Sequence, residues 1–156
     1  TTPELVLVGH AARVPLIHEG ANPHIQAHIA SIAPEEHLRL KAMSDAEPGG
    51  ILAVTGDVAP DAPEGTELTY LHGVSVSAST VVPDDLDAIR VEAGAWAVFS
   101  ASGPFPETLQ TLWAATATEW FPSNPWRLRP GPSIVRYLEF TGSHASCELW
   151  LAVEPT

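Results

Sequence analysis

The sequence predicts an α+β domain in which a single antiparallel sheet carries its helices on one face. Apolar runs of strand length alternate with two longer segments whose apolar residues recur at helical spacing. Neighbouring strand-like runs are separated by turns rich in proline and glycine, which is typical of antiparallel pairing. The order strand, helix, strand, strand occurs twice, at about residues 1–80 and 81–156, and this indicates an internal duplication. One such copy is too small to bury a core alone, so we expect both to share one sheet in a single domain over residues 1–156.

The strands are predicted from apolar runs bounded by turn-forming residues. Those of the first pseudo-repeat are Glu4–Leu16, Ile51–Val54 and Leu68–Val76, and those of the second are Ala88–Ser100, Ser133–Phe140 and Cys147–Val153. The polar, proline-containing segment Ser77–Asp87 is predicted to connect the two pseudo-repeats.

Each pseudo-repeat is predicted to contain one helix. The first begins at Asn22-Pro23, because asparagine is a good N-cap and proline suits the first helical position. Pro34 breaks or kinks this helix, which resumes over Glu35–Met43, and the second helix spans Pro106–Phe121. The positions expected to face the core are Ile25, Ile29, Ile32, Leu38 and Leu40 in the first helix, and Leu109, Leu112, Trp113, Thr116 and Trp120 in the second.

The charge balance limits the class of partner. The chain has 7 Lys and Arg against 19 Asp and Glu, a net charge of −12, whereas a nucleic-acid-binding surface needs cations to displace counterions from phosphates. Arg127, Arg129 and Arg136 form the one basic cluster, and we expect it at a solvated strand edge. An acidic protein instead favours cationic small molecules. No apolar run approaches the roughly 20 residues that span a bilayer, and no signal peptide is recognisable, so we expect a cytoplasmic protein without membrane contact.

Four segments resemble the GyrI-like effector-binding domains of bacterial multidrug-responsive transcription activators. They are Glu67–Val74, Ile89–Phe99 with its Gly-Ala-Trp-Ala-Val-Phe end, Trp113–Pro122, and Glu148–Pro155. The resemblance spans nearly the whole chain and is strongest in the second half. Two departures affect the shape of the pocket, since Trp96 replaces the family's usual tyrosine and Pro34 interrupts the first helix.

The resemblance implies a duplicated strand-helix-strand-strand fold with an aromatic ligand cleft between the two helices. The family's pocket often holds a buried glutamate that pairs with lipophilic cations, and this residue corresponds to Glu148. The family's tyrosine on the third strand corresponds to Tyr70. Some relatives are fused to DNA-binding domains, others stand alone, and a few hydrolyse strained, electrophilic natural products.

The resemblance therefore implies a candidate ligand site around Glu148. Strand alternation puts Glu148 and Trp150 on one side, and alternation alone favours a solvent-facing pair, whereas the resemblance favours a pocket walled by Trp150 and the second helix. Desolvation there would raise the pKa of the glutamate, and a cationic ligand would offset that cost. The other predicted ligand-binding residues are Tyr70, His72, Trp113, Trp120 and Phe99. Trp113 also fits a core position, and Tyr70 equally fits a sheet residue with its hydroxyl at the surface.

No metal or cofactor site is predicted. His24 and His28 share a helix face but lack the further ligands of a zinc site, so surface histidines are expected. The single cysteine, Cys147, faces away from Glu148 and fits a small buried hydrophobe. A Gly-x-Ser-x-Gly nucleophile motif does not occur.

Three functions remain open from the sequence. The first is a domain that binds a lipophilic, aromatic or cationic small molecule, either alone or with a DNA-binding domain, and without nucleic-acid contact of its own. The second is a hydrolase on the same scaffold, with Glu148 as general acid or base and Tyr70 as hydrogen-bond donor. The third is a protein-interaction role through the acidic surface.

Overall fold

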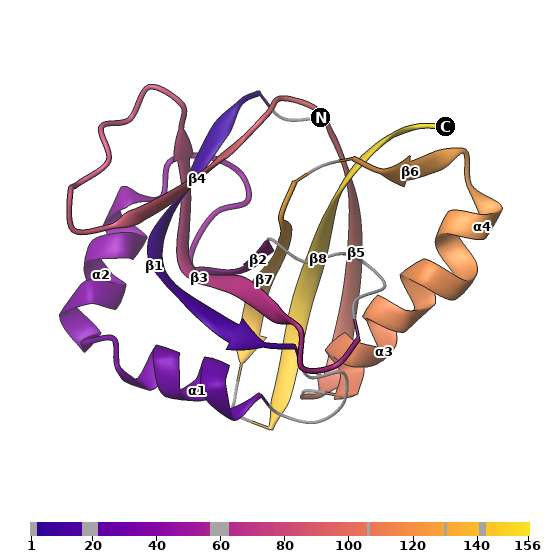
Figure 1. Cartoon of the computed structure of the whole chain (residues 1–156), viewed down its shortest axis with the longest axis horizontal. Coiled ribbons are helices and arrows are strands. Elements are labelled where there is room, and N and C mark those ends of the chain that lie inside the picture. Colours follow the sequence, from indigo (N-terminus) through magenta and orange to yellow (C-terminus); the bar gives the residue numbers. More distant parts are fainter. Residues whose placement is uncertain (1–2, 17–21, 57–62, 106, 130, 141–142) are drawn as a thin grey trace.

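The computed structural model describes residues 3–16, 22–56, 63–105, 107–129, 131–140 and 143–156 (Figure 1). Its strands form one eight-stranded antiparallel sheet: β1 (Leu5–Pro15), β2 (Leu52–Gly56), β3 (Glu67–Ser77), β4 (Asp87–Val91), β5 (Ala95–Pro104), β6 (Trp126–Leu128), β7 (Ser133–Phe140) and β8 (His144–Pro155). The helices are α1 (Pro23–Ala30), α2 (Pro34–Met43), α3 (Glu107–Ala115) and α4 (Phe121–Ser123), with a π-helical turn, η1 (Thr116–Trp120), between the last two. The predicted α+β class is confirmed.

The strand order reflects the repeated sequence order. The sheet runs β4-β1-β3-β2-β7-β8-β5, and β6 pairs with the end of β8. The three strands β1-β3-β2 of the first half are mirrored by β5-β8-β7 of the second, and β2 pairs antiparallel with β7 at the centre. Both halves thus follow strand-helix-strand-strand order and contribute to one continuous sheet.

The sheet is strongly curled. Only residues 92–94 connect β4, at one edge, to β5, at the other edge. Such a link spans at most about 14 Å, so the two edges come close together at this end. The prediction of one strand over Ala88–Ser100 is therefore wrong, because a short bend divides this apolar run between opposite edges of the sheet.

A pair of glycines allows close strand contact within the curl. Gly9 of β1 is paired with Gly73 of β3. A Cβ atom at Gly73 would lie 2.0 Å from the Val8 carbonyl oxygen, and one at Gly9 would lie 2.1 Å from the His72 carbonyl oxygen. A side chain at either position would force the strands apart.

The concave face of the curl holds a core of its own. Val91 of β4 and Trp96 of β5 meet in one cluster although their strands form opposite edges, which places this cluster inside the curl. Its fully or nearly fully buried members are Leu5, Leu7, Leu52, Val54, Leu71, Val91 and Ile134.

The helices cover the convex face. In the first half Leu40 of α2 packs on β1 and β3, and in the second half α3 packs on β7 and β8. Ala53 of the central strand β2 touches both the α1 cluster and the α3 cluster, so all these helices share one face of the sheet. Figure 1 shows α1 and α2 over one half (purple, left) and α3 and α4 over the other (orange, right). The predicted placement of the helices on one face is correct.

The helices depart from prediction in detail. The first helix is broken rather than kinked, one of the two expected outcomes: α1 ends at Ala30 and α2 starts at Pro34. Leu40 is fully buried, but Leu38 is 70% exposed, so the expectation of a buried Leu38 is wrong. The buried stripe of a short helix on a convex sheet is narrow, and a leucine two positions away points outward. The second helix breaks into α3, η1 and α4, and its expected start at Pro106 lies outside the described residues.

The last predicted strand begins earlier than expected, and β6 was not foreseen. The strand β8 starts at His144 rather than Cys147. The three residues of β6 pair with Glu154 and its neighbours at the end of β8. A three-residue strand is too short for its sequence pattern to predict this pairing. The longest helix in the described part of the chain has 10 residues, and none there meets the length and hydropathy of a bilayer span.

Candidate functional site

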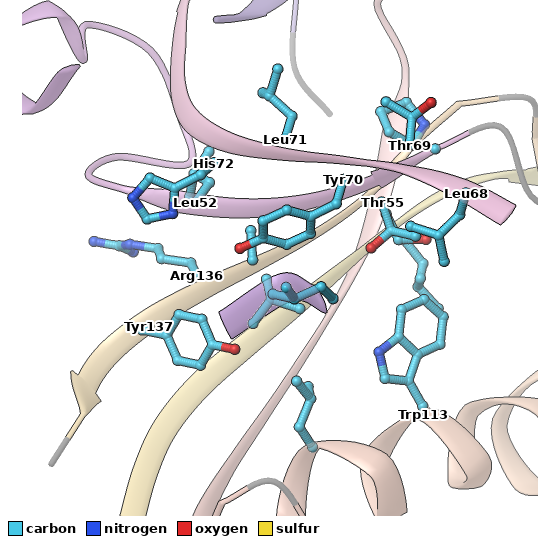
Figure 2. A pocket seen from close by; sticks show the side chains of 18 of the residues that line it. Leu52, Thr55, Leu68, Thr69, Tyr70, Leu71, His72, Trp113, Arg136 and Tyr137 are labelled. Carbon is cyan, nitrogen blue, oxygen red and sulfur yellow. The ribbon is translucent and has the colours of Figure 1, made fainter. Parts of the chain in front are cut away.

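A cleft on the convex face lies between α1 and α3, above the central strands β2 and β7. Strand pairing builds its floor, because Ala53 lies opposite His72 on one side and Val135 on the other, and Thr55 lies opposite Tyr70. The floor residues are Ala53, Thr55, Leu68, Tyr70, His72, Val135 and Tyr137, and the walls include Ile25, Ile29, Leu109, Trp113 and Phe121. Figure 2 shows Trp113 rising from α3 toward the side of the cleft where Leu68 and Thr55 lie.

Two tyrosines supply the phenol groups of the floor. Tyr70 is 3% exposed and its ring makes an edge contact with His28 of α1 at 6.0 Å. Tyr137 makes an edge contact with Phe105 at 5.9 Å. Burial raises the pKa of Tyr70 far above its usual value, with a smaller contribution from Tyr137, and burial raises the pKa of Tyr137 to about 12. Both phenols are therefore uncharged at neutral pH, and Figure 2 shows their hydroxyls pointing into the same space.

The Tyr70 hydroxyl is open to the cleft. Among the described residues it makes no hydrogen bond, and no buried side-chain nitrogen or oxygen there lacks a partner. An oxygen without a partner in this part of the chain must therefore be accessible, and the cleft is the space that Tyr70 lines.

His72 forms the polar end of the floor. Its Nε2 lies 3.0 Å from Nδ1 of His37 on α2, and the two ring centroids are 4.8 Å apart. Burial, and after it the neighbouring imidazoles of His37, His28 and His10 in that order, lowers the pKa of His72 to about 4. His72 is therefore neutral at pH 7, and one imidazole of the pair donates to the other.

A polar network attaches the helices beside the cleft to the sheet. His28 Nε2 of α1 donates to the His10 carbonyl oxygen at 2.8 Å, and His10 Nε2 donates to Glu36 of α2 at 3.0 Å. Arg39 of α2 forms a bidentate pair with Asp85, at 2.7 and 2.8 Å. The hydrogen bond from His10 is the main cause that lowers the pKa of Glu36, and Arg39 is the main cause that lowers the pKa of Asp85 to about 2.

Glu148 lies on the opposite face of the sheet from the cleft. Its neighbours Cys147 and Leu149 point toward α3 and are 1% and 0% exposed, whereas Glu148 pairs with Arg136 across the strands. Arg136 Nη1 and Trp150 Nε1 both donate to Glu148 Oε1, at 3.3 and 3.2 Å. The expectation that α3 walls this carboxylate is therefore wrong, because strand alternation gives the helix-facing positions to its neighbours.

This placement also separates the predicted catalytic pair. Tyr70 is on the convex face, so Glu148 and Tyr70 have the sheet between them and cannot hold one water molecule together. Trp150 follows Glu148 to the concave face, where its ring packs edge-on against Trp96 at 5.9 Å.

The remaining predicted aromatics divide between two places. Tyr70, His72 and Trp113 line the cleft, whereas Phe99 and Trp120 pack against each other at 5.2 Å beside a smaller hollow behind α3. The sequence reasoning missed Tyr137 and Val135, which occupy alternate positions of β7 and face the helices. Alternation within Ser133–Phe140 was the available signal, but choosing the helix-facing set required the pairing with β2.

The π-helical turn sets the aromatic arrangement after Trp113. A π turn inserts an extra residue into a helix and is frequent at functional sites. Here the Thr116 hydroxyl donates to the Trp113 carbonyl oxygen at 2.7 Å at the start of the turn. Beyond it Phe121 lines the cleft, and Trp120 is directed toward Phe99.

Other candidate groups have structural surroundings. Within the described ranges, no three His, Cys, Asp or Glu side chains are arranged to hold a metal ion. His24 is exposed, and Cys147 is buried beside α3, with its pKa raised by burial. Of the basic cluster expected at a solvated strand edge, Arg127 pairs with Glu154 at 2.9 Å and Arg129 lies over the Trp96 ring at 5.2 Å. The expectation is wrong for Arg136, which lies on the central strand β7 and pairs with Glu148, because β7 is flanked by β2 and β8.

The fold and the cleft together define a class of protein. Two strand-helix-strand-strand halves form one curled antiparallel sheet, and an aromatic cleft lies between their helices. The sequence matches the GyrI-like small molecule binding domain over residues 1–154, and the chain belongs to this family. No curated protein sequence matches the chain.

Two solved structures have the same fold. One is SAV2435 bound to tetraphenylphosphonium, with a TM-score of 0.66 and 19% identity over 97% of this chain and 90% of that one. The other is a protein named "Putative bacterial transcription regulation protein" from Staphylococcus aureus MU50, with a TM-score of 0.59 and 19% identity over 97% of this chain and 94% of that one. At this level of identity the likeness shows the fold.

Proposed function

We propose that this domain binds a lipophilic, aromatic small molecule in the cleft between α1 and α3, as the effector-binding part of a transcription regulator or as a stand-alone sensor. The observation that carries the proposal is the cleft itself, in which apolar and aromatic side chains from both halves surround a few polar groups. Ligand sites of this composition bind mainly through apolar burial and use the polar groups for orientation. The tetraphenylphosphonium bound to SAV2435 supports a cleft that accepts several aromatic rings.

The α1 wall suits a role in signalling. None of its residues is fully buried, and the side chains of Ile25 and Ile29 are only partly buried against the floor. Its described ties to β1 are the hydrogen bond of His28 and one from Asn22 Nδ2 to the Pro15 carbonyl oxygen at 2.8 Å. Because α1 buries so little apolar area, displacing it costs little free energy. A ligand that packs better against one α1 position than another would shift the population between them.

The cleft can be tested as the binding site by filling it. Ala53 is half-buried at the centre of the floor, between the α1 and α3 clusters, so Ala53→Phe would occupy the space of a ligand ring. The matched control is Ala42→Phe on the exposed side of α2. Binding of tetraphenylphosphonium and of triphenylphosphine oxide is followed by tryptophan fluorescence, with thermal unfolding to verify the fold.

We expect at least one compound to bind the unchanged chain and the Ala42→Phe variant equally, and at least tenfold more weakly to Ala53→Phe. Equal affinity for folded Ala53→Phe would place binding elsewhere. Absence of saturable binding of both compounds to the unchanged chain would contradict the proposed function.

A further inference from the structure

The polar groups that meet at the floor of the cleft carry no formal charge. They are the hydroxyls of Thr55, Tyr70 and Tyr137 and the imidazole of His72. Arg136 also lines the pocket, but it lies on the other face of β7 and its charge is paired with Glu148. Burial keeps both phenols protonated, and it keeps the imidazole neutral at pH 7. The described carboxylates that line the pocket are Asp87, exposed at the start of β4, and Glu107, exposed at the start of α3, and neither belongs to the floor strands β2, β3 and β7.

The carboxylate expected to receive a cation is already compensated elsewhere. Glu148 accepts from both Arg136 and Trp150 on the concave face, and the central strands separate it from the cleft. An Arg–Glu pair of this kind has no net charge to offer a ligand.

We propose that the cleft selects uncharged aromatic ligands that carry a hydrogen-bond acceptor, and that the open Tyr70 hydroxyl is the donor that holds the acceptor. This inference rests on the proposed function and specifies the ligand class of that same site.

Two opposing effects on a cation support this selectivity. Aromatic faces such as those of Trp113 and Tyr70 attract a cation, and the net charge of −12 attracts it from a distance. However, the long-range field is screened within about 8 Å at physiological ionic strength. Stripping water from a cation costs more than a ring face returns when no counter-ion accompanies it. A neutral ligand has no such penalty, and its acceptor oxygen satisfies the Tyr70 hydroxyl.

The test uses two probes of nearly equal size that carry the same three phenyl rings. Triphenylphosphine oxide is neutral and has a strong acceptor oxygen, whereas methyltriphenylphosphonium is a cation without an acceptor. Their dissociation constants are measured by tryptophan fluorescence and calorimetry on the unchanged chain, on Tyr70→Phe and on Glu148→Gln. Tyr70→Phe removes only the hydroxyl, and Glu148→Gln removes the charge that a cation would seek.

We expect the oxide to bind at least tenfold more tightly than the phosphonium. Tyr70→Phe is expected to weaken oxide binding about fivefold without changing phosphonium binding, and Glu148→Gln is expected to change neither. Phosphonium binding that equals or exceeds oxide binding would overturn the inference, as would weaker phosphonium binding in Glu148→Gln or unchanged oxide binding in Tyr70→Phe.

The Ala53→Phe variant separates this inference from the proposed function. If the phosphonium is preferred and Ala53→Phe still abolishes its binding, the cleft is the ligand site and only the ligand class is wrong. If Ala53→Phe leaves the binding of both probes intact, the proposed site fails as well.

Discussion

Acidification is expected to destabilise this domain through His72. The imidazole is 8% exposed, packs against His37, and has a pKa lowered from 6.5 to about 4. Between these two values the unfolded chain binds a proton that the folded chain excludes. The contribution of neutral His72 to stability is therefore complete above about pH 6.5 and is lost as the pH falls toward 4. The loss amounts to about 2 kcal/mol at pH 5 and about 3 kcal/mol at pH 4.

The measurement is the free energy of unfolding in urea at pH 7.5 and pH 5, for the unchanged chain and for His72→Gln. Glutamine cannot be protonated, and its amide nitrogen occupies nearly the place of Nε2, so this variant should lose about 2 kcal/mol less on acidification. The comparison removes the contributions of Glu36 and Asp85, whose pKa values are lowered and which therefore lose their stabilisation at still lower pH. His24→Gln, at an exposed position of α1, is the control and should follow the unchanged chain. An equal loss in His72→Gln and in the unchanged chain would refute the reasoning.

Three further predictions concern packing and signal. Leu40→Ala should lower the free energy of unfolding, measured in urea, by about 2–5 kcal/mol, because Leu40 is fully buried between α2 and the sheet. Leu38 is 70% exposed, so Leu38→Ala should change the same free energy by about 0.5 kcal/mol or less. Gly73→Ala should prevent cooperative folding, since its Cβ would lie 2.0 Å from a carbonyl oxygen, while Gly49→Ala meets nothing within 4 Å and should melt like the unchanged chain. Trp113→Phe should remove most of the ligand-induced fluorescence change while it preserves binding by calorimetry, because Trp113 is the tryptophan that lines the described cleft; an undiminished fluorescence change would place the ligand near another indole.

The local elements of the fold were predictable because their signals are local. Asn22 caps α1 through its side chain, which accepts from the backbone of His24 and Ile25 at 3.0 and 3.2 Å. The breaks at proline and the antiparallel order of β2 and β3 also follow from short-range sequence preferences. For the candidate site, the prediction of Tyr70, His72 and Trp113 placed three residues that do line the cleft.

The misplaced residues all depend on long-range pairing. Alternation correctly put the side chains of Glu148 and Cys147 on different faces of the sheet, but it could not say which of the two faces the helices. In a curled sheet both faces of a strand are buried, so apolar residues occupy both sides of the strand. The sequence pattern then does not show which side faces the helices. Val135 and Tyr137 were missed for the same reason, since they became cleft residues only once β7 paired with β2.

The sequence by itself determined the duplicated order of elements and the α+β class, because propensity, capping and hydrophobic periodicity act over a few residues. It also contains the aromatic side chains that a pocket can use. Only the tertiary structure decided which face each side chain occupies. It brought β4 and β5 to opposite edges across a link of residues 92–94, enclosed Trp150 and Glu148 within the curl, and left Tyr70 and His72 facing the helices. The physical reason is that the curl of the sheet and its central β2–β7 pairing arise from contacts between residues far apart in the chain, and those contacts set the chemistry of the cleft.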